Sequence, residues 1–282
     1  MSNREFSRYE ALNLKIDEDR VLTYSNIACP LDCKYCFANE IIRGHENEDG
    51  IYLSEEQFGL LEQLPADIKT VMLGCDTEFL QDKTQALQIL KRLTAISKDI
   101  SVITKLPLDD KFIAELAEID NTLRRNGNFL TFSVSLACTK SKDKWELRTP
   151  SVASRVETLR KVCEAGIDSM VAIRPLIPNI EPCELDEIID ATKDYVVGYY
   201  SGPMYLKELS DDTINAEELA SLGCVVNEEI EEVHWMPEGN KFLKIESPKL
   251  MAYLQNKIEQ SGKILFEGAA DGMDYLREGN HA

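Results

Sequence analysis

Six apolar runs rich in β-branched residues alternate with helical patterns along the first two-thirds of this 282-residue chain. The runs cover residues 20–28, 69–74, 99–105, 129–137, 168–178 and 195–202. Helical patterns lie between them at 54–63, 83–97, 108–123, 151–165 and 184–193, and the first opens on the capping sequence "SEEQ". Strands separated by single helices predict a parallel sheet with right-handed crossovers. An open doubly wound sheet and a curled partial barrel both fit, and both place ligands at the carboxyl ends of the strands.

The segments that flank this α/β pattern differ from it. Residues 1–20 are polar and lack the apolar centre of a secretory signal. Beyond residue 204 follow an acidic, helix-like segment at 207–219, a hairpin pattern around "PEGN" at 237–240, and a helix with a strand at 247–266. We therefore predict a leader (1–20), an α/β domain (21–204) and a small α+β C-terminal extension (205–282) packed on that domain.

The balance of charge limits the partners of the chain. Fifty Asp and Glu residues against 31 Lys and Arg residues give a net charge of -19, which repels polyphosphate backbones and anionic lipid surfaces. No apolar stretch approaches the roughly 20 residues that cross a bilayer. We expect a soluble, cytoplasmic protein for which neither a membrane nor nucleic acid is a favoured partner.

Three of the eight cysteines lie in one short stretch directly after the first predicted strand: Cys29, Cys33 and Cys36 in "CPLDCKYC". A closed zinc site needs four ligands, and no second Cys or His pair follows at suitable spacing; the nearest histidine, His45, lies in a polar loop. A four-iron cluster held by three thiolates leaves one iron open to a substrate or cofactor. The spacing favours such an open iron–sulfur site, and a non-catalytic metal or redox module is the alternative.

The cysteine run, with Tyr35 before its third cysteine and Phe37 after it, resembles the signature loop of the radical S-adenosylmethionine (SAM) superfamily. "MLGCDTEF", "VITKLPL", "ELRTPS" and "RPLIP" resemble segments of its spore photoproduct lyase and DNA repair photolyase-like branch. The resemblance spans roughly residues 21–180 and implies a partial (β/α)6 TIM-type barrel. It also implies a [4Fe-4S] cluster on Cys29, Cys33 and Cys36, and reductive cleavage of SAM to a 5'-deoxyadenosyl radical that abstracts hydrogen from a substrate.

The same resemblance assigns residues at successive strand ends to SAM. Gly74 and Asp76 follow the second strand, where family members bind the SAM amino group, and Glu78 is expected to cap the next helix. Lys105 ends the third strand and is the expected partner of the SAM carboxylate. The further cofactor contacts that we predict are Tyr35, Phe37, Ser133, Ser135, Arg148 and Ile177. Ser133 and Ser135 alternate along the fourth strand, so their side chains share one face.

Cys75, in "LGCDTEF", lies where spore photoproduct lyase carries a cysteine that returns a hydrogen atom to the repaired thymine radical. We interpret Cys75 as a hydrogen-atom donor; the alternative is a small residue required for close packing beside SAM. The histidine-bearing continuation of the lyase is absent here, which puts a DNA substrate in doubt.

The leading hypothesis is a radical SAM enzyme that acts on a small molecule or on a residue of a peptide or protein. A one-electron donor such as flavodoxin or ferredoxin would reduce its cluster. A nucleic acid substrate is the alternative, and it predicts a basic groove lined by Lys140, Lys142, Lys144, Arg148 and Arg155.

Overall fold

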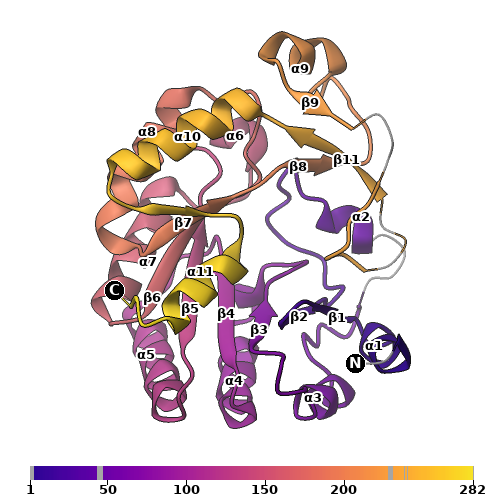
Figure 1. Ribbon diagram of the computed structural model, residues 1–282, viewed down its shortest axis with the longest axis vertical. Coiled ribbons are helices and arrows are strands. Elements are labelled where there is room, and N and C mark those ends of the chain that lie inside the picture. Colours follow the sequence, from indigo (N-terminus) through magenta and orange to yellow (C-terminus); the bar gives the residue numbers. More distant parts are fainter. Residues whose placement is uncertain (1–2, 43–46, 228–230, 238, 240, 282) are drawn as a thin grey trace.

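A curved eight-stranded sheet with helices on its outer face forms the body of the protein (Figure 1). The computed structural model describes residues 3–42, 47–227, 231–237, 239 and 241–281, and the sheet is counted over these residues. Its strands, in spatial order, are β1 (Leu14–Asp17), β2 (Arg20–Thr23), β3 (Thr70–Leu73), β4 (Asp99–Thr104), β5 (Leu130–Ser135), β6 (Asp168–Ile173), β7 (Gly198–Ser201) and β12 (Ile264–Phe266). All pairs from β2 to β12 are parallel, and β1 is antiparallel to β2. The predicted partial barrel is confirmed.

The helices that connect these strands begin within two residues of their predicted starts. They are α3 (Glu55–Leu61), α4 (Lys83–Leu93), α5 (Asp110–Arg125), α7 (Val152–Glu164) and α8 (Pro182–Thr192). Ser54 and Gln57 form the capping box of α3, and Ser151 caps α7. Strands β5 and β6 are buried at every position, because helices cover one face and the barrel interior covers the other.

The sheet also takes strands from both flanking segments. Residues 1–20, predicted as a leader, contain α1 (Asn3–Glu10) and β1, and β1 pairs with β2. At the other edge, β12 pairs in parallel with β7. A Cβ at Gly198 would lie 2.5 Å from the Phe266 ring, so this close pairing requires glycine. The barrel sheet therefore draws on all three predicted segments.

A second, smaller sheet stands beside the carboxyl ends of the barrel strands. In it β11 (Lys241–Glu246) pairs with β8 (Met204–Leu206), β9 (Val225–Val226) and β10 (Glu231–Glu232). The β10–β11 pair confirms the predicted hairpin, although residues 238 and 240 lie outside the described residues. The C-terminal region also contains α9 (Ala216–Leu222) and α10 (Pro248–Gln260), and the shorter elements of the chain are α2 (Ala38–Ile42), α6 (Lys142–Trp145), η1 (Phe79–Gln81), η2 (Thr94–Ile96) and η3 (Lys193–Tyr195).

The last helix, α11 (Ala269–Arg277), packs against the inward-facing side chains of the barrel. In Figure 1 it crosses in front of β4 and β5. A Cβ at Gly272 would lie 2.3 Å from the sulfur of Met170 on β6, and the Thr131 hydroxyl on β5 donates to the sulfur of Met273 at 2.8 Å. The C-terminal extension, predicted to pack on the barrel, thus also contributes to the barrel interior.

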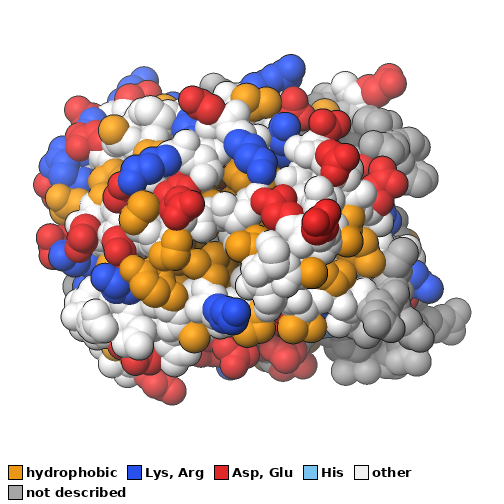
Figure 2. Space-filling model, turned by 90° about the horizontal axis from the view of Figure 1, so that it is seen from above, with side chains coloured by type: hydrophobic (Ala, Val, Ile, Leu, Met, Phe, Trp, Pro, Cys, Tyr) orange, Lys and Arg blue, Asp and Glu red, His pale blue; other side chains and the backbone are white. Residues whose placement is uncertain are grey.

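The surface carries both signs of charge. Seen from above, Lys and Arg side chains are interspersed with carboxylates, and apolar patches lie between them (Figure 2). Over the described residues, no helix is long and apolar enough to cross a bilayer.

Candidate active site

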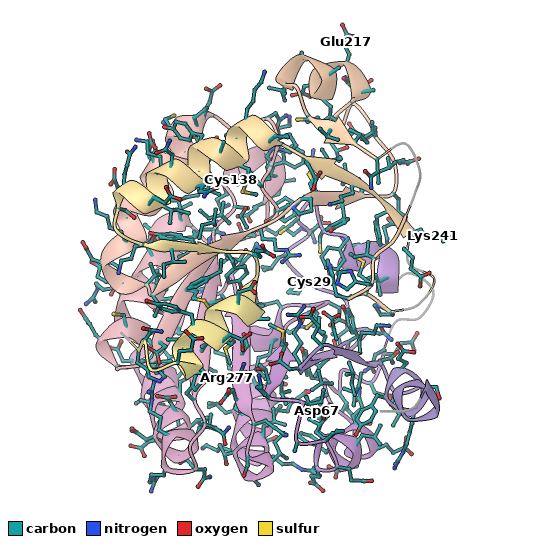
Figure 3. All side chains as sticks on the ribbon, viewed as in Figure 1. Cys29, Asp67, Cys138, Glu217, Lys241 and Arg277 are labelled. Carbon is teal, nitrogen blue, oxygen red and sulfur yellow. The ribbon has the colours of Figure 1, made fainter. Side chains whose placement is uncertain are left out.

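A cavity of about 300 Å³ opens at the carboxyl ends of the strands, a size within the usual range of ligand pockets. Its wall includes the cysteine loop after β2, the segments after β3 and β4, and parts of the C-terminal region. Figure 3 shows Cys29 in the middle of the molecule, on the segment that joins β2 and α2. The cavity lies at the edge of the sheet where the parallel arrangement predicts the site.

The three clustered cysteines all line this cavity. Asn26 and Asp32 give the loop its shape, because both adopt the left-handed backbone conformation (φ 56° and 50°) that Asn and Asp tolerate. Burial raises the pKa of all three thiols, that of Cys33 to about 12, and interactions of Cys33 with Cys36 and Cys29 add to its rise. The thiols are therefore desolvated and close enough to influence one another.

The cysteine set fits an open iron–sulfur cluster better than a closed zinc site. No three His, Cys, Asp or Glu side chains among the described residues converge as ligands of a single metal ion. A cluster does not require this, because each thiolate binds a different iron. Hydrogen bonds from the backbone of Leu31 and Glu78 lower the pKa of Cys29 against the effect of burial, and such bonds to sulfur tune clusters.

The histidines offer no fourth ligand within the described residues. His281 lies 2.7 Å from Asp168 at the opposite end of the barrel, and His234 is exposed. His45, which we considered as a zinc ligand, lies outside the described residues.

Asp76 has a second role that the sequence did not reveal. Its buried carboxylate accepts hydrogen bonds from the Asn26 amide at 2.6 Å and the Ser25 hydroxyl at 3.2 Å, so it fixes the backbone that leads into the cysteine loop. Burial raises the pKa of Asp76 to about 6, and these hydrogen bonds oppose the rise. Gly74 has φ +88°, and a Cβ there would lie 3.0 Å from the Ile103 carbonyl oxygen, so only glycine fits this position.

Lys105 and Ser135 form a polar pair on the cavity wall. The Lys105 ammonium donates to the Ser135 hydroxyl at 2.6 Å and lies 3.8 Å from the fully buried carboxylate of Glu146. Burial is the largest single effect and lowers the pKa of Lys105, but Glu146, Cys33 and Cys36 together outweigh it and the net shift is upward. Glu146 also binds Arg155 at 2.8 Å and the Tyr35 hydroxyl, which connects the cysteine loop to this network. The wall therefore presents a fixed ammonium that suits a carboxylate.

Other predicted cofactor residues differ in their relation to the cavity. Phe37 lines it, and Tyr35 does so from within the cysteine loop. Ser133, Arg148 and Ile177 are not part of the wall. Ser133 is fully buried deeper in the barrel, Ile177 is fully buried, and Arg148 is exposed with Asp32 3.8 Å away. Their assignment to SAM stays a prediction.

Glu78 caps the next helical turn, as expected from the sequence. Its carboxylate accepts from the Leu80 amide at 3.2 Å and also from the Thr104 hydroxyl and the Lys105 amide, at 2.6 and 2.8 Å. This structural role occupies both of its oxygens.

Several wall residues were missed by reasoning from the sequence. Arg174 continues the inward alternation of Met170 and Ala172 beyond the end of β6, a signal that becomes readable once the inner face of β6 is known. Trp235, from the C-terminal region, packs edge-to-face on Phe37 (5.2 Å between ring centroids) and on Tyr205 (5.8 Å). No local pattern marks Trp235, because its place depends on contact with a loop some 200 residues earlier.

The basic groove of the nucleic acid alternative is not formed as expected. Arg155 is fully buried against Glu146, so it cannot line a surface groove. Lys140 pairs with Glu187 at 2.6 Å, and the Lys144 ammonium lies 5.0 Å from the centre of the Trp145 ring. These local partners reduce the positive charge available to a phosphate backbone.

Comparison with known families agrees with this geometry. The family model for the Radical SAM superfamily matches residues 25–192, more than half of the chain. The chain belongs to the radical SAM superfamily. Members of this family use SAM and an iron–sulfur cluster. No curated protein matches the sequence.

Solved structures of radical SAM enzymes share the fold. Streptococcus suis SuiB bound to S-adenosylmethionine is 13% identical with a TM-score of 0.58, and the match covers 93% of this chain and 53% of SuiB. SuiB bound to its precursor peptide SuiA is 14% identical (TM-score 0.57; 93% and 51%). Spore photoproduct lyase complexed with dinucleoside spore photoproduct is 12% identical (TM-score 0.61; 85% and 74%). This chain thus spans about half the length of SuiB, and at such identities the likeness concerns the fold.

Proposed function

We propose that this radical SAM protein is an enzyme that holds a [4Fe-4S] cluster on Cys29, Cys33 and Cys36 and binds SAM in the adjoining cavity. One observation carries the proposal: the three cysteines and the Lys105–Ser135 pair, from three separate segments, line one cavity at the carboxyl ends of the strands. Flavodoxin or ferredoxin would supply the electron.

The residues of the cavity have distinct tasks in this proposal. When bound, the cluster and SAM would supply a 5'-deoxyadenosyl radical that abstracts a hydrogen atom from the substrate. Lys105, with Ser135, would hold the SAM carboxylate, and the ionised Asp76 would accept from the SAM ammonium. Phe37 and Trp235 form an aromatic wall that excludes water from the reacting atoms.

We propose Cys75 as the hydrogen-atom donor. It lines the cavity, and its pKa is raised to about 12, first by burial and then by Asp76, so it remains a thiol at neutral pH. In the proposed step the S–H bond of Cys75 breaks homolytically and the hydrogen atom passes to the substrate radical. The resulting thiyl radical would then take up one electron from the same one-electron donor and one proton from water. Close packing beside SAM is the alternative role for this residue.

We propose a small molecule, or a residue of a peptide or protein, as the substrate. The SuiB complex with a precursor peptide supports the peptide class by likeness of fold. The net charge of -19 and the burial of Arg155 weigh against a nucleic acid like that in the spore photoproduct lyase complex.

Anaerobic reconstitution with iron and sulfide, followed by incubation with SAM and dithionite, tests the proposal. We expect about four irons per chain and release of 5'-deoxyadenosine. The Cys75→Ala variant should keep both properties, because Cys75 is not a proposed ligand. An intact cluster without SAM cleavage would contradict the proposal, and loss of iron in Cys75→Ala would make Cys75 a ligand instead of a hydrogen donor.

A further inference from the structure

Arg174 is a cation on the cavity wall without an anionic partner. Its guanidinium lies 5.3 Å from the centre of the Trp235 ring, and none of the described residues gives it a hydrogen bond or ion pair. The chain carries 50 Asp and Glu residues, yet none of the described ones forms an ion pair with Arg174, and Arg20, a second cation on the same wall, lowers its pKa further. Arg20 already pairs with Asp17 at 2.5 Å.

An isolated cation at this position is costly to the folded protein. Burial lowers the pKa of Arg174, but a guanidinium remains protonated in proteins. The uncharged neighbours Tyr24, Tyr200 and Tyr205 cannot neutralise it as a carboxylate would. Arg174 is partly exposed to the cavity. Charges that are largely removed from water are normally paired, so the missing partner of Arg174 points to an anion brought by a ligand.

The start of α11 faces the same part of the cavity. Gly268, the N-cap, and Ala269 and Ala270 in the first turn line the wall, and no side chain caps this turn. The amide groups at a helix N-terminus favour an anion through hydrogen bonds and the helix dipole. Asp271, also in the first turn, is exposed and is not part of the wall, but its Oδ2 lies 3.8 Å from the position that a Cβ at Gly268 would take, so one carboxylate borders this turn.

Two glycines leave room beside the guanidinium. A Cβ at Gly268 would lie 3.9 Å from Nη1 of Arg174, and a Cβ at Gly202 would lie 3.2 Å from its Nε. The absence of these side chains leaves the Arg174 guanidinium accessible where it meets the first turn of α11.

The adjoining wall is apolar and aromatic. Leu22 and Met72 line it from β2 and β3, and Tyr205 and Trp235 line it from the C-terminal region. Cys75 belongs to this part of the wall, since it packs in the same apolar cluster as Leu22, Met72, Tyr205 and Trp235. A molecule held at its anionic end by Arg174 would place an apolar or planar body between this wall and Cys75.

We infer that the substrate of the proposed radical SAM reaction carries an oxyanion, a carboxylate or a phosphate, that binds Arg174 and the first turn of α11. This inference depends on the proposed function only in naming the bound molecule as the substrate, because the anion site is defined by its own residues. It is also separate from the proposed site for the SAM carboxylate. Lys105 follows β4, whereas Arg174 follows β6, and β5 lies between these strands.

Calorimetric titration of the reconstituted, SAM-loaded protein tests the inference. Phenyl phosphate and benzoate serve as anionic probes, and benzyl alcohol serves as a neutral probe of similar shape. The variants are Arg174→Gln, Arg174→Lys, and the matched control Arg160→Gln on the outer helix α7, where Arg160 pairs with Glu157 at 2.7 Å. We expect Arg174→Gln to lower the affinity for at least one anionic probe by about tenfold or more. Arg174→Lys should retain part of the affinity, and Arg160→Gln all of it.

The outcomes separate the anion site from its alternatives. Tighter binding of phenyl phosphate identifies a phosphate, and tighter binding of benzoate a carboxylate. Equal binding of neutral and anionic probes, or equal losses in Arg174→Gln and Arg160→Gln, would overturn the inference. If Arg174→Gln does not fold, the comparison of Arg174→Lys with wild type decides, because a two-pronged anion contact is lost with lysine while the charge remains.

The proposed function can fail separately. Wild-type protein that releases no 5'-deoxyadenosine but binds anions through Arg174 would refute radical SAM activity and leave the anion site standing. To detect this outcome, the titration with the anionic probes is repeated without SAM.

Discussion

Charged side chains have different partners at the two ends of the barrel. At the amino-terminal end of the strands, the cations are surrounded by carboxylates: Arg277 lies 2.7 Å from Asp99, and Arg124 lies 2.7 Å from Asp168. At the carboxyl end, Arg174 has no carboxylate partner among the described residues. Removing one partner of a pair at the amino-terminal end would leave an uncompensated charge, whereas the unpaired charge of Arg174 is available to a ligand.

Helix α11 connects these two ends. Its C-terminal residue Arg277 contacts Asp19, Asp99 and Asp274 near the amino-terminal end, and its first turn borders the cavity. Figure 3 shows Arg277 at the lower part of the barrel and Cys29 above it. The same helix therefore secures the barrel at one end and contributes backbone amides to the candidate site at the other.

The largest effect on activity is expected at the carboxyl end of the barrel, for the substitution Cys33→Ala. Because Cys33 is a proposed cluster ligand, we expect 5'-deoxyadenosine release to fall to background and iron content to drop. The melting temperature of the cluster-free protein should change little, since the Cys33 thiol makes no hydrogen bond to any of the described residues. The matched control is Cys163→Ala in α7, away from the cavity wall. Equal loss of iron in both variants would refute the assignment of the cluster to the loop.

The buried network behind the cysteine loop predicts the largest effect on stability. Glu146→Gln removes the carboxylate that pairs with Arg155 at 2.8 Å and lies 3.8 Å from Lys105. Removing one partner of a buried ion pair leaves uncompensated charge, and we expect a loss of about 4 kcal/mol in the free energy of unfolding. Urea denaturation of the cluster-free protein measures it.

A matched control for this variant is Glu157→Gln, in an exposed pair with Arg160. It should change the urea midpoint little, because exposed pairs contribute little to stability. If Glu146→Gln were equally mild, Glu146 would not be required to compensate the buried cations beside the cysteine loop.

Asp76 predicts a pH dependence of stability at the carboxyl end. Its pKa is about 6 in the folded protein and about 3.9 in an unfolded chain. Between these values the folded state binds a proton that the unfolded state does not, so this group makes the free energy of unfolding fall as pH rises through the window. The loss reaches about 3 kcal/mol above pH 6. Asp76→Asn should lack it, so the stability of the variant relative to wild type should rise between about pH 4 and about pH 6.

The difference between the two proteins isolates Asp76 from the other carboxylates that titrate in this range. Parallel curves of unfolding free energy against pH would contradict the raised pKa. In the reconstituted enzyme, SAM affinity should also increase with pH through the same window in wild type and not in Asp76→Asn, because the SAM ammonium binds the ionised carboxylate.

Features that depend on local sequence were predicted well. The order of strands and helices follows from alternating apolar patterns, and Ser54 caps the helix that the sequence "SEEQ" predicted. Lys105 and Ser135 come together because parallel strands bring their carboxyl ends to one edge.

Features that depend on distant contacts could not be predicted in this way. Asp76 binds the backbone of Asn26, 50 residues away, and Trp235 reaches the cysteine loop from the C-terminal region. The position of α11 is set by close packing of Gly272 on Met170, which no periodic pattern in either segment indicates. In each case the deciding contact joins elements whose relative position is fixed by the completed fold.

Arg277→Gln tests the amino-terminal end of the comparison, and its expected effect is the smallest. The substitution removes the charged hydrogen bond to Asp99. Asp99 still accepts hydrogen bonds from the backbone amide of Phe129 at 3.1 Å and from the side-chain amide of Asn128 at 3.2 Å. We therefore expect a loss of about 2 kcal/mol in the free energy of unfolding. The control is Arg125→Gln, an exposed arginine at the end of α5.

The rate of 5'-deoxyadenosine release decides what Arg277→Gln means. Below the melting temperature of the variant this rate should stay close to wild type, because the paired charges at this end hold the barrel and do not contact the proposed cofactor site. If the rate instead fell with little loss of stability, Arg277 would act on the cavity through α11, whose first turn lies on the cavity wall. The two ends would then be coupled, and the division between charges that stabilise the fold and charges that bind ligands would fail at this helix.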